Sequence, residues 1–107
     1  MTALLGAALG GRLADLKHPA RHVGHLTLPM IVELLVDHRT SVPGACSGAL
    51  LRRRVRGVWR AHLVFLDEFD EPILDGPGIE GYWSSTVDTF DDELVEMFAG
   101  TDLIVFR

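Results

Sequence analysis

The segment LLRRRVRGVWRAHLVFL, residues 50–66, decides the fold, because it can form either a helix or β-structure. As a helix it would align one seam at alternating spacings of four and three residues: Leu51, Val55, Val58, His62, Phe65 and Phe69. As β-structure it alternates between apolar and polar residues, with exceptions mainly at Arg53 and Val58. We predict β-structure with a break near Gly57, since a helix would leave several apolar residues on its polar side. The helix remains the alternative.

The residues that follow predict further strands. Val58–Asp67 and Pro72–Asp75 flank a charged turn, Glu68–Glu71, as in an antiparallel hairpin. A second turn signal, DGPG at residues 75–78, precedes a strand over Ile79–Val87. The apolar Leu103–Phe106 predicts a last strand in the interior of the sheet.

Two helices are predicted near the N-terminus. Ala3–Lys17 carries leucines at helical spacing, together with three glycines that weaken a helix. The second helix begins after Thr27, which can cap it, has Pro29 in its first turn and ends at His38. A loop over Arg39–Gly48 follows.

The strongest helix pattern covers about residues 89–99. Thr89 or Asp91 can cap this helix, acidic residues favour its first turn, and Gly100 ends it. We therefore predict an α+β fold in a single domain of residues 1–107. It has two N-terminal helices, an antiparallel sheet of about four strands, and the 89–99 helix packed on the sheet.

Charge divides the chain near residue 62. Residues 1–62 hold nine of the ten Lys and Arg side chains and all five histidines, but three of the fifteen acids. Residues 63–107 hold the other twelve acids and one base, Arg107, and the net charge is −5. Such asymmetry indicates recognition of a charged partner or self-association, and it does not identify a reaction.

Composition limits the cellular setting. The sequence has no run of eighteen apolar residues, so we expect no transmembrane helix and no membrane partner. The one cysteine, Cys46, excludes an internal disulfide and is typical of a reducing compartment, so we expect a cytoplasmic protein. Nine Arg against one Lys is typical of a high-GC genome, bacterial or phage.

Three histidines, His18, His22 and His25, have a spacing that would place them on one side of a helix. Three imidazoles can hold Zn²⁺, Ni²⁺ or Cu²⁺. Pro19 and Gly24 interrupt such a helix, and a His-rich loop is the competing interpretation. Beyond this hypothetical metal site we expect no cofactor.

Two motif matches are insufficient to predict an enzyme. Cys46 and Arg52 have the Cys-x5-Arg spacing of the tyrosine-phosphatase loop, in which an arginine holds a phosphate over a thiolate. The residues that normally precede that loop are absent. Leu63–Glu68 resembles a Walker B strand, but no Walker A lysine accompanies it. We interpret these features as an ordinary thiol and a hairpin strand.

Two charged groups are candidate binding sites. The acidic residues expected to bind a basic protein partner are Asp67, Glu68, Asp70, Glu71, Asp88, Asp91, Asp92 and Glu96. The basic residues expected to project from one face of a strand are Arg52, Arg54, Arg56 and Arg60. We expect these arginines to pair with acids of the same chain or of a second copy, in a homo-oligomer, rather than with nucleic acid.

Three function classes remain. The first is a protein-binding module of the inhibitor, immunity or regulatory type, acting through an acidic C-terminal face. The second is a small enzyme with a pocket in a curved sheet, with optional metal assistance from the histidine cluster. Its expected pocket residues are His62, Asp67, Tyr82 and Trp83. The third is a nucleic-acid binder that uses the arginines. We favour the first class.

Overall fold

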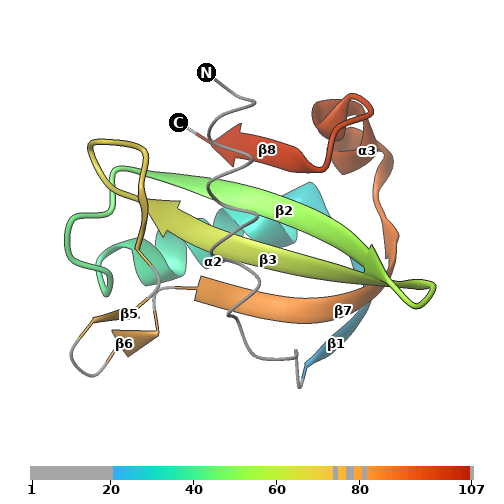
Figure 1. The fold of residues 1–107 in the computed structure, drawn as a ribbon, viewed down its shortest axis with the longest axis horizontal. Coiled ribbons are helices and arrows are strands. Elements are labelled where there is room, and N and C mark those ends of the chain that lie inside the picture. Colours follow the sequence, from blue (N-terminus) through green and yellow to red (C-terminus); the bar gives the residue numbers. More distant parts are fainter. Residues whose placement is uncertain (1–20, 74, 77–78, 81, 107) are drawn as a thin grey trace.

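The computed structural model describes residues 21–73, 75–76, 79–80 and 82–106. The described elements are β1 (His22–Leu26), α2 (Leu28–Arg39), β2 (Ser47–Val55), β3 (Val58–Leu66), β4 (Pro72–Ile73), β5 (Asp75–Gly76), β6 (Ile79–Glu80), β7 (Tyr82–Phe90), α3 (Asp92–Phe98) and β8 (Leu103–Phe106). Figure 1 shows their arrangement, which confirms a mixed α+β fold. Neither described helix is both long enough and apolar enough to cross a membrane.

Residues 50–66 form an antiparallel hairpin, β2–β3, rather than a helix. Val55 pairs with Val58, so Arg56 and Gly57 alone make the turn. Their φ angles are 53° and 79°, and two successive positive φ values are typical of the two-residue turns that match the twist of a hairpin. The predicted break near Gly57 is therefore confirmed.

The main sheet has six described strands in the order β1-β7-β3-β2-β8, with β4 paired to β3. Strand β1 is parallel to β7, and the other neighbours in this order are antiparallel. The prediction of about four antiparallel strands was therefore wrong. The strand that the sequence analysis did not predict is β1, a short and largely polar segment that pairs with β7, 64 residues later in the sequence. Strand β8 exists as predicted, but it forms an edge of this sheet rather than its interior.

Helix α2 confirms the second predicted helix. The N–H of Met30 donates to Oγ1 of the capping Thr27, at 3.3 Å. Helix α3 confirms the predicted C-terminal helix, and Asp91 rather than Thr89 is its cap. The helix predicted over Ala3–Lys17 lies outside the described residues.

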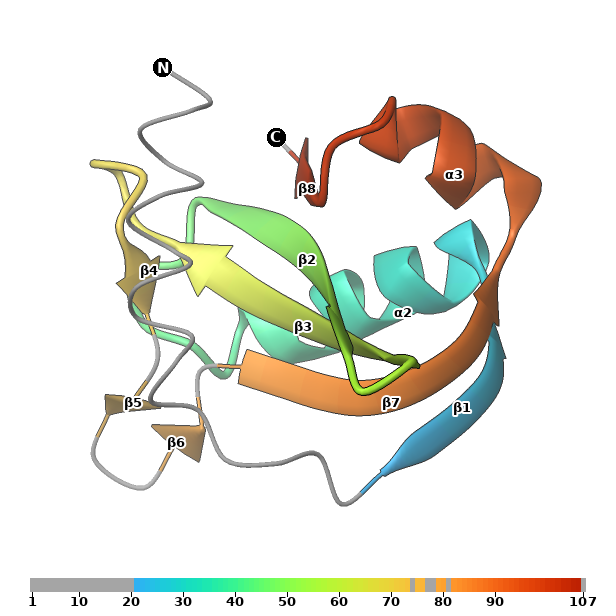
Figure 2. The ribbon, with the colours of Figure 1, turned by 45° about the vertical axis from the view of Figure 1, so that its right-hand side comes forward.

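Both described helices pack on the same face of the sheet, which we call the helix face (Figure 2). The buried core there joins residues of the helices and strands: Leu26, Ile31, Leu50, Ala61, Leu63, Val87, Leu94, Phe98 and Ile104. Helix α2 approaches β2 so closely that a Cβ on Gly48 would lie 2.5 Å from Cδ2 of Leu35. A side chain at position 48 would therefore require Leu35 to change its rotamer.

The Arg52 side chain holds α3 and the loop before β8 to the sheet. Its guanidinium carbon lies 4.1 Å from the ring centre of Phe98 and 5.0 Å from that of Trp59. Its Nε donates to Oδ1 of Asp102, and its terminal nitrogen donates to the carbonyl of Thr101, each at 3.1 Å. The side chain is 14% exposed, so this cation is a part of the packing of the domain.

Candidate functional site

Helix α3 presents an acidic surface at one end of the sheet (Figure 1). Leu94 and Phe98 are buried, and the rest of the helix faces solvent. The exposed residues, which we call the α3 surface, are Asp92, Glu93, Val95, Glu96 and Met97. The two apolar members are 47% and 41% exposed, so the surface combines negative charge with solvent-facing hydrophobic area. That combination is suited to recognition of a basic protein.

Asp91 belongs to the predicted acidic face, but its carboxylate is bonded within the chain. Oδ1 accepts the N–H of Leu94 at 2.8 Å, which caps α3. Oδ2 accepts the N–H of Leu28, the first residue of α2, at 2.9 Å. One carboxylate thus joins the N-termini of both described helices, where the helix dipoles favour negative charge. We therefore assign Asp91 a structural role.

The acids of the β3–β4 turn lie at the opposite end of the sheet from α3 (Figures 1 and 2). Strand β3 ends at this turn, whereas α3 follows the far end of the antiparallel β7. Within the turn, Oδ1 of Asp67 accepts the N–H groups of Phe69 and Glu71, at 2.8 and 3.0 Å. The predicted acids Asp67, Glu68, Asp70 and Glu71 therefore form a surface separate from that of α3.

The predicted histidine cluster is not assembled in the described part of the chain. His18 lies outside the described residues. Nδ1 of His22 lies 2.7 Å from Oγ1 of Thr86, and its Nε2 lies 3.1 Å from Oδ2 of Asp88. Nδ1 of His25 lies 2.8 Å from Oγ1 of Thr89. Within the described ranges no three His, Cys, Asp or Glu side chains gather as metal ligands would.

The four predicted stripe arginines do not share one face. Arg52 and Arg54 lie on the helix face, because they pair with Ala61 and Trp59. Arg56 lies in the turn. Arg60 lies on the opposite face of the sheet, which we call the second face, directly across from Arg53. The stripe was predicted as one alternating run, and the hairpin turn breaks this alternation.

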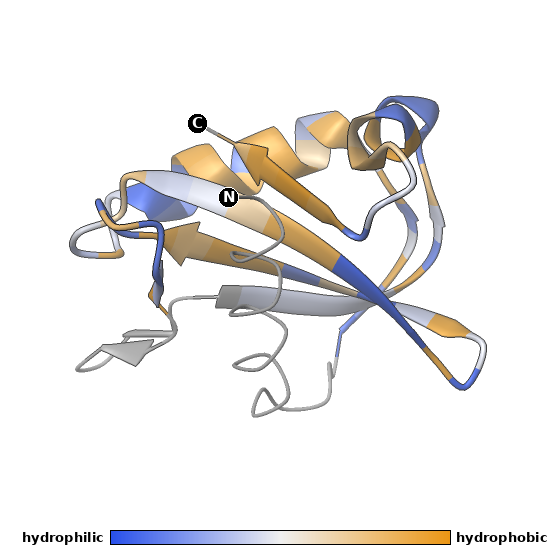
Figure 3. Ribbon diagram, turned by 45° about the horizontal axis from the view of Figure 1, so that its top comes forward, coloured by the Kyte–Doolittle hydropathy of each residue, from blue (hydrophilic) through white to orange (hydrophobic). Residues whose placement is uncertain are grey.

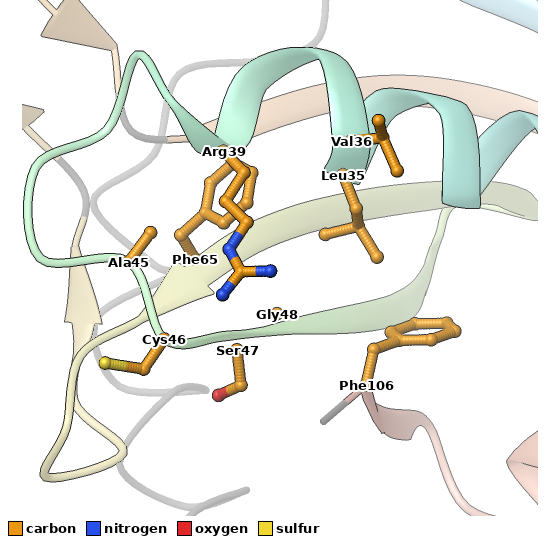
Figure 4. A pocket seen from close by; sticks show the side chains of 9 residues that line it. All are labelled: Leu35, Val36, Arg39, Ala45, Cys46, Ser47, Gly48, Phe65 and Phe106. Carbon is orange, nitrogen blue, oxygen red and sulfur yellow. The ribbon is translucent and has the colours of Figure 1, made fainter.

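One hollow lies between the end of α2 and the strands β2, β3 and β8, with a volume of about 160 Å³. Its lining is mainly apolar: Leu35, Val36, Arg39, Ala45, Cys46, Ser47, Gly48, Phe65 and Phe106. Figure 4 shows the guanidinium of Arg39 between α2 and the start of β2, and the sulfur of Cys46 pointing away from the hollow. Pockets for metabolites and cofactors have about 300–1,000 Å³, so this hollow suits at most one side chain or a very small molecule.

The candidate catalytic groups do not meet at this hollow. His62, Asp67 and Trp83, expected in an enzyme pocket, are absent from its described lining. Cys46 and Arg52 are separated by six residues, mostly along β2, or about 20 Å at the rise of a strand. The guanidinium of Arg52 also forms an ion pair with Asp102 and packs against aromatic rings. The spacing of a phosphatase loop is therefore present without its geometry.

His62 is buried on the second face, where its Nδ1 lies 2.6 Å from Oγ of Ser84. Burial is the main cause that lowers the pKa of His62 to about 4, and the charges of Arg60 and Arg53 contribute to the same shift. The imidazole is therefore neutral at pH 7. A base this weak is a poor activator of Ser84, so the pair is better interpreted as a hydrogen bond within the sheet.

Comparisons of the chain with protein-family models, with curated proteins and with solved structures find no match. The sequence predicted the α3 acids as part of a candidate surface, which stays a prediction, and it did not indicate that Arg53 lies across from Arg60. A two-residue turn at Arg56 and Gly57 would have predicted this pair, because it places odd-numbered residues of one strand across from even-numbered residues of the other.

Proposed function

We propose that this chain is a protein-binding module of the inhibitor, immunity or regulatory type, whose partner presents a basic surface to helix α3. The observation that supports this most directly is the exposure of three acids and two apolar side chains on a helix of seven residues. Acids would steer a basic partner and select its orientation, while desolvated apolar side chains supply contact energy.

The second described helix adds to the same type of surface. On α2, Val32 and Val36 are 46% and 67% exposed, and the acids Glu33 and Asp37 are exposed beside them. The N-termini of α2 and α3 are joined through Asp91. A partner docked on α3 could therefore extend its contact onto α2.

The size and lining of the hollow also favour recognition over catalysis. A volume of about 160 Å³ is about that of one buried aromatic ring or aliphatic side chain. Its apolar lining and the neighbouring Arg39 suit an anchoring side chain of a bound protein.

The test is co-purification with a tagged protein from its own host, comparing wild type with Asp92→Asn/Glu96→Lys. Both positions are exposed and lie one helical turn apart, so the change should leave folding intact. The control, Glu68→Lys/Glu71→Gln, makes the same charge change at the distant β3–β4 turn. We expect a basic protein to be retained in equal amounts with wild type and control, and lost with the α3 variant.

Retention of that protein by the α3 variant would contradict the assignment of the α3 surface. Equal loss in both variants would indicate a dependence on net charge alone, and would equally count against a specific site.

A further inference from the structure

The second face of the sheet carries an ordered set of side chains that the proposed protein-binding surface does not use. One row crosses four strands, because Arg53 pairs with Arg60, Arg60 with Thr86, and Thr86 with His22. The next row contains Leu51, His62 and Ser84 with Leu103. Beyond it, the face is apolar: Ala49, Val64, Leu66 and Val105. Figure 3 shows this change along β2, from orange to blue toward the β2–β3 turn.

Two cations stand directly opposite each other in the first row. Residues that face each other across antiparallel strands have Cβ atoms about 5 Å apart, and like charges in such a pair repel. The ion pairs of the described residues join Arg52 to Asp102 and His22 to Asp88, and neither includes Arg53 or Arg60. Within the described part of the chain, this repulsion is therefore not balanced by an acid.

The surroundings of the arginine pair suit an oxyanion. Arg53 is exposed and Arg60 is half-buried, so a ligand can reach both guanidinium groups from solvent. Thr86, next in the row, adds no free donor, because its hydroxyl donates to the carbonyl of Arg21 and lies 2.7 Å from Nδ1 of His22. Guanidinium groups match the oxygen spacing of phosphate, with two parallel hydrogen bonds each.

We propose that Arg53 and Arg60 form a binding site for a phosphate group, free or as a monoester. The site is independent of the α3 surface, since it lies on the opposite face of the sheet from both described helices. A bound phosphate would place a negative charge between the two cations, where the described residues place none.

The pKa of His62 should change when this site binds phosphate. The charges of Arg60 and Arg53 lower the pKa of His62, in addition to its burial. The other groups near it on this face are Ser84, and the His22–Asp88 pair at the far end of the arginine row. A phosphate bound to the arginines would offset their charges, so it would raise the pKa of His62.

The experiment is an NMR titration of the full chain with sodium phosphate and with phenyl phosphate, against sodium sulfate and sodium chloride at matched ionic strength. We expect saturable shifts of the amide signals of the first row with phosphate, and a higher pKa of His62 in its presence. Arg53→Gln and Arg60→Gln should each weaken binding roughly tenfold, the loss expected for a charged hydrogen-bonded contact. The control, Arg56→Gln in the turn, should bind as wild type does.

Tighter binding of phenyl phosphate would identify a monoester as the ligand, and equal binding would identify the free anion. The proposal is overturned if phosphate acts no differently from chloride, or if sulfate binds as tightly as phosphate, which would mean an adventitious ion only. It is also overturned if Arg56→Gln loses as much affinity as the other two variants. Each arginine variant should be as stable as wild type, because it removes a repulsion, so failed folding would not hide the outcome.

Discussion

Replacement of Asp91 by alanine tests whether this acid holds the fold together or serves a partner. Its carboxylate accepts the N–H groups of Leu94 and Leu28, at 2.8 and 2.9 Å. Loss of a helix cap costs about 1 kcal/mol. The bond to Leu28 is also made to a charged acceptor and contributes about 1–2 kcal/mol. We therefore expect Asp91→Ala to lower the free energy of unfolding by about 2–3 kcal/mol.

The assay is urea unfolding followed by tryptophan fluorescence, with thermal unfolding as a second measurement. A loss of this size corresponds to a decrease in Tm of about 10 °C or more for a chain of this length. The matched control is Asp92→Ala, the next residue, which is exposed in the first turn of α3. It should cost about 0.5 kcal/mol, the usual contribution of one charge to the helix dipole.

Asp91→Asn should fall between the two, because its side chain keeps one acceptor oxygen for capping. The reasoning is refuted if Asp91→Ala and Asp92→Ala have the same stability within about 0.5 kcal/mol, a difference too small for two lost bonds. In that case the carboxylate of Asp91 would be available for a partner, and the acidic surface would be larger than we propose.

Two further predictions concern the sheet. Gly48→Val should lower the free energy of unfolding by about 1–3 kcal/mol in urea unfolding, because the new side chain overlaps Leu35; Gly48→Ala should cost less, since Leu35 can rotate, and equal costs would contradict this packing. His62 has a folded pKa of about 4, below its value of 6.5 in the unfolded chain. As the pH falls, His62 is therefore protonated in the unfolded chain before it is protonated in the folded chain. The free energy of unfolding should decrease between pH 6.5 and pH 4, by up to about 3 kcal/mol. The His62→Gln variant should not show this decrease in the free energy of unfolding. If its pH dependence equals that of wild type, His62 is not the cause of the decrease.

The features that sequence predicted correctly are those set by neighbouring residues. Thr27 caps α2 because its hydroxyl needs only the N–H three residues later. Gly57 marks the hairpin turn because a positive φ favours glycine. Such signals act over a few residues, so they can be interpreted without knowledge of the fold.

The features that sequence missed depend on pairing over long distances. Strand β1 is short and largely polar, and its strand character comes from β7, 64 residues away. The arginine stripe failed for a related reason. In a two-residue hairpin the paired positions have opposite parity, so Arg54 faces Trp59 and Arg60 faces Arg53. Alternation along a sequence defines a face only within one strand.

The candidate acidic face was divided in the same way. Local composition grouped the acids of α3 and of the β3–β4 turn into one candidate face. The antiparallel course of β3 and β7 then placed them at opposite ends of the sheet. The carboxylate of Asp67 accepts a hydrogen bond within the β3–β4 turn, and that of Asp91 accepts one at the cap of α3. We therefore do not count these two acids in the binding surface.

The central claim, that this chain binds a protein, is tested most directly by native mass spectrometry of the complex isolated gently from its own host. The account predicts a species with the mass of this 11.8 kDa chain plus one second, basic polypeptide, which dissociates as the ionic strength rises. A chain found alone, as a homo-oligomer, or with only a metal or a small molecule bound would contradict it.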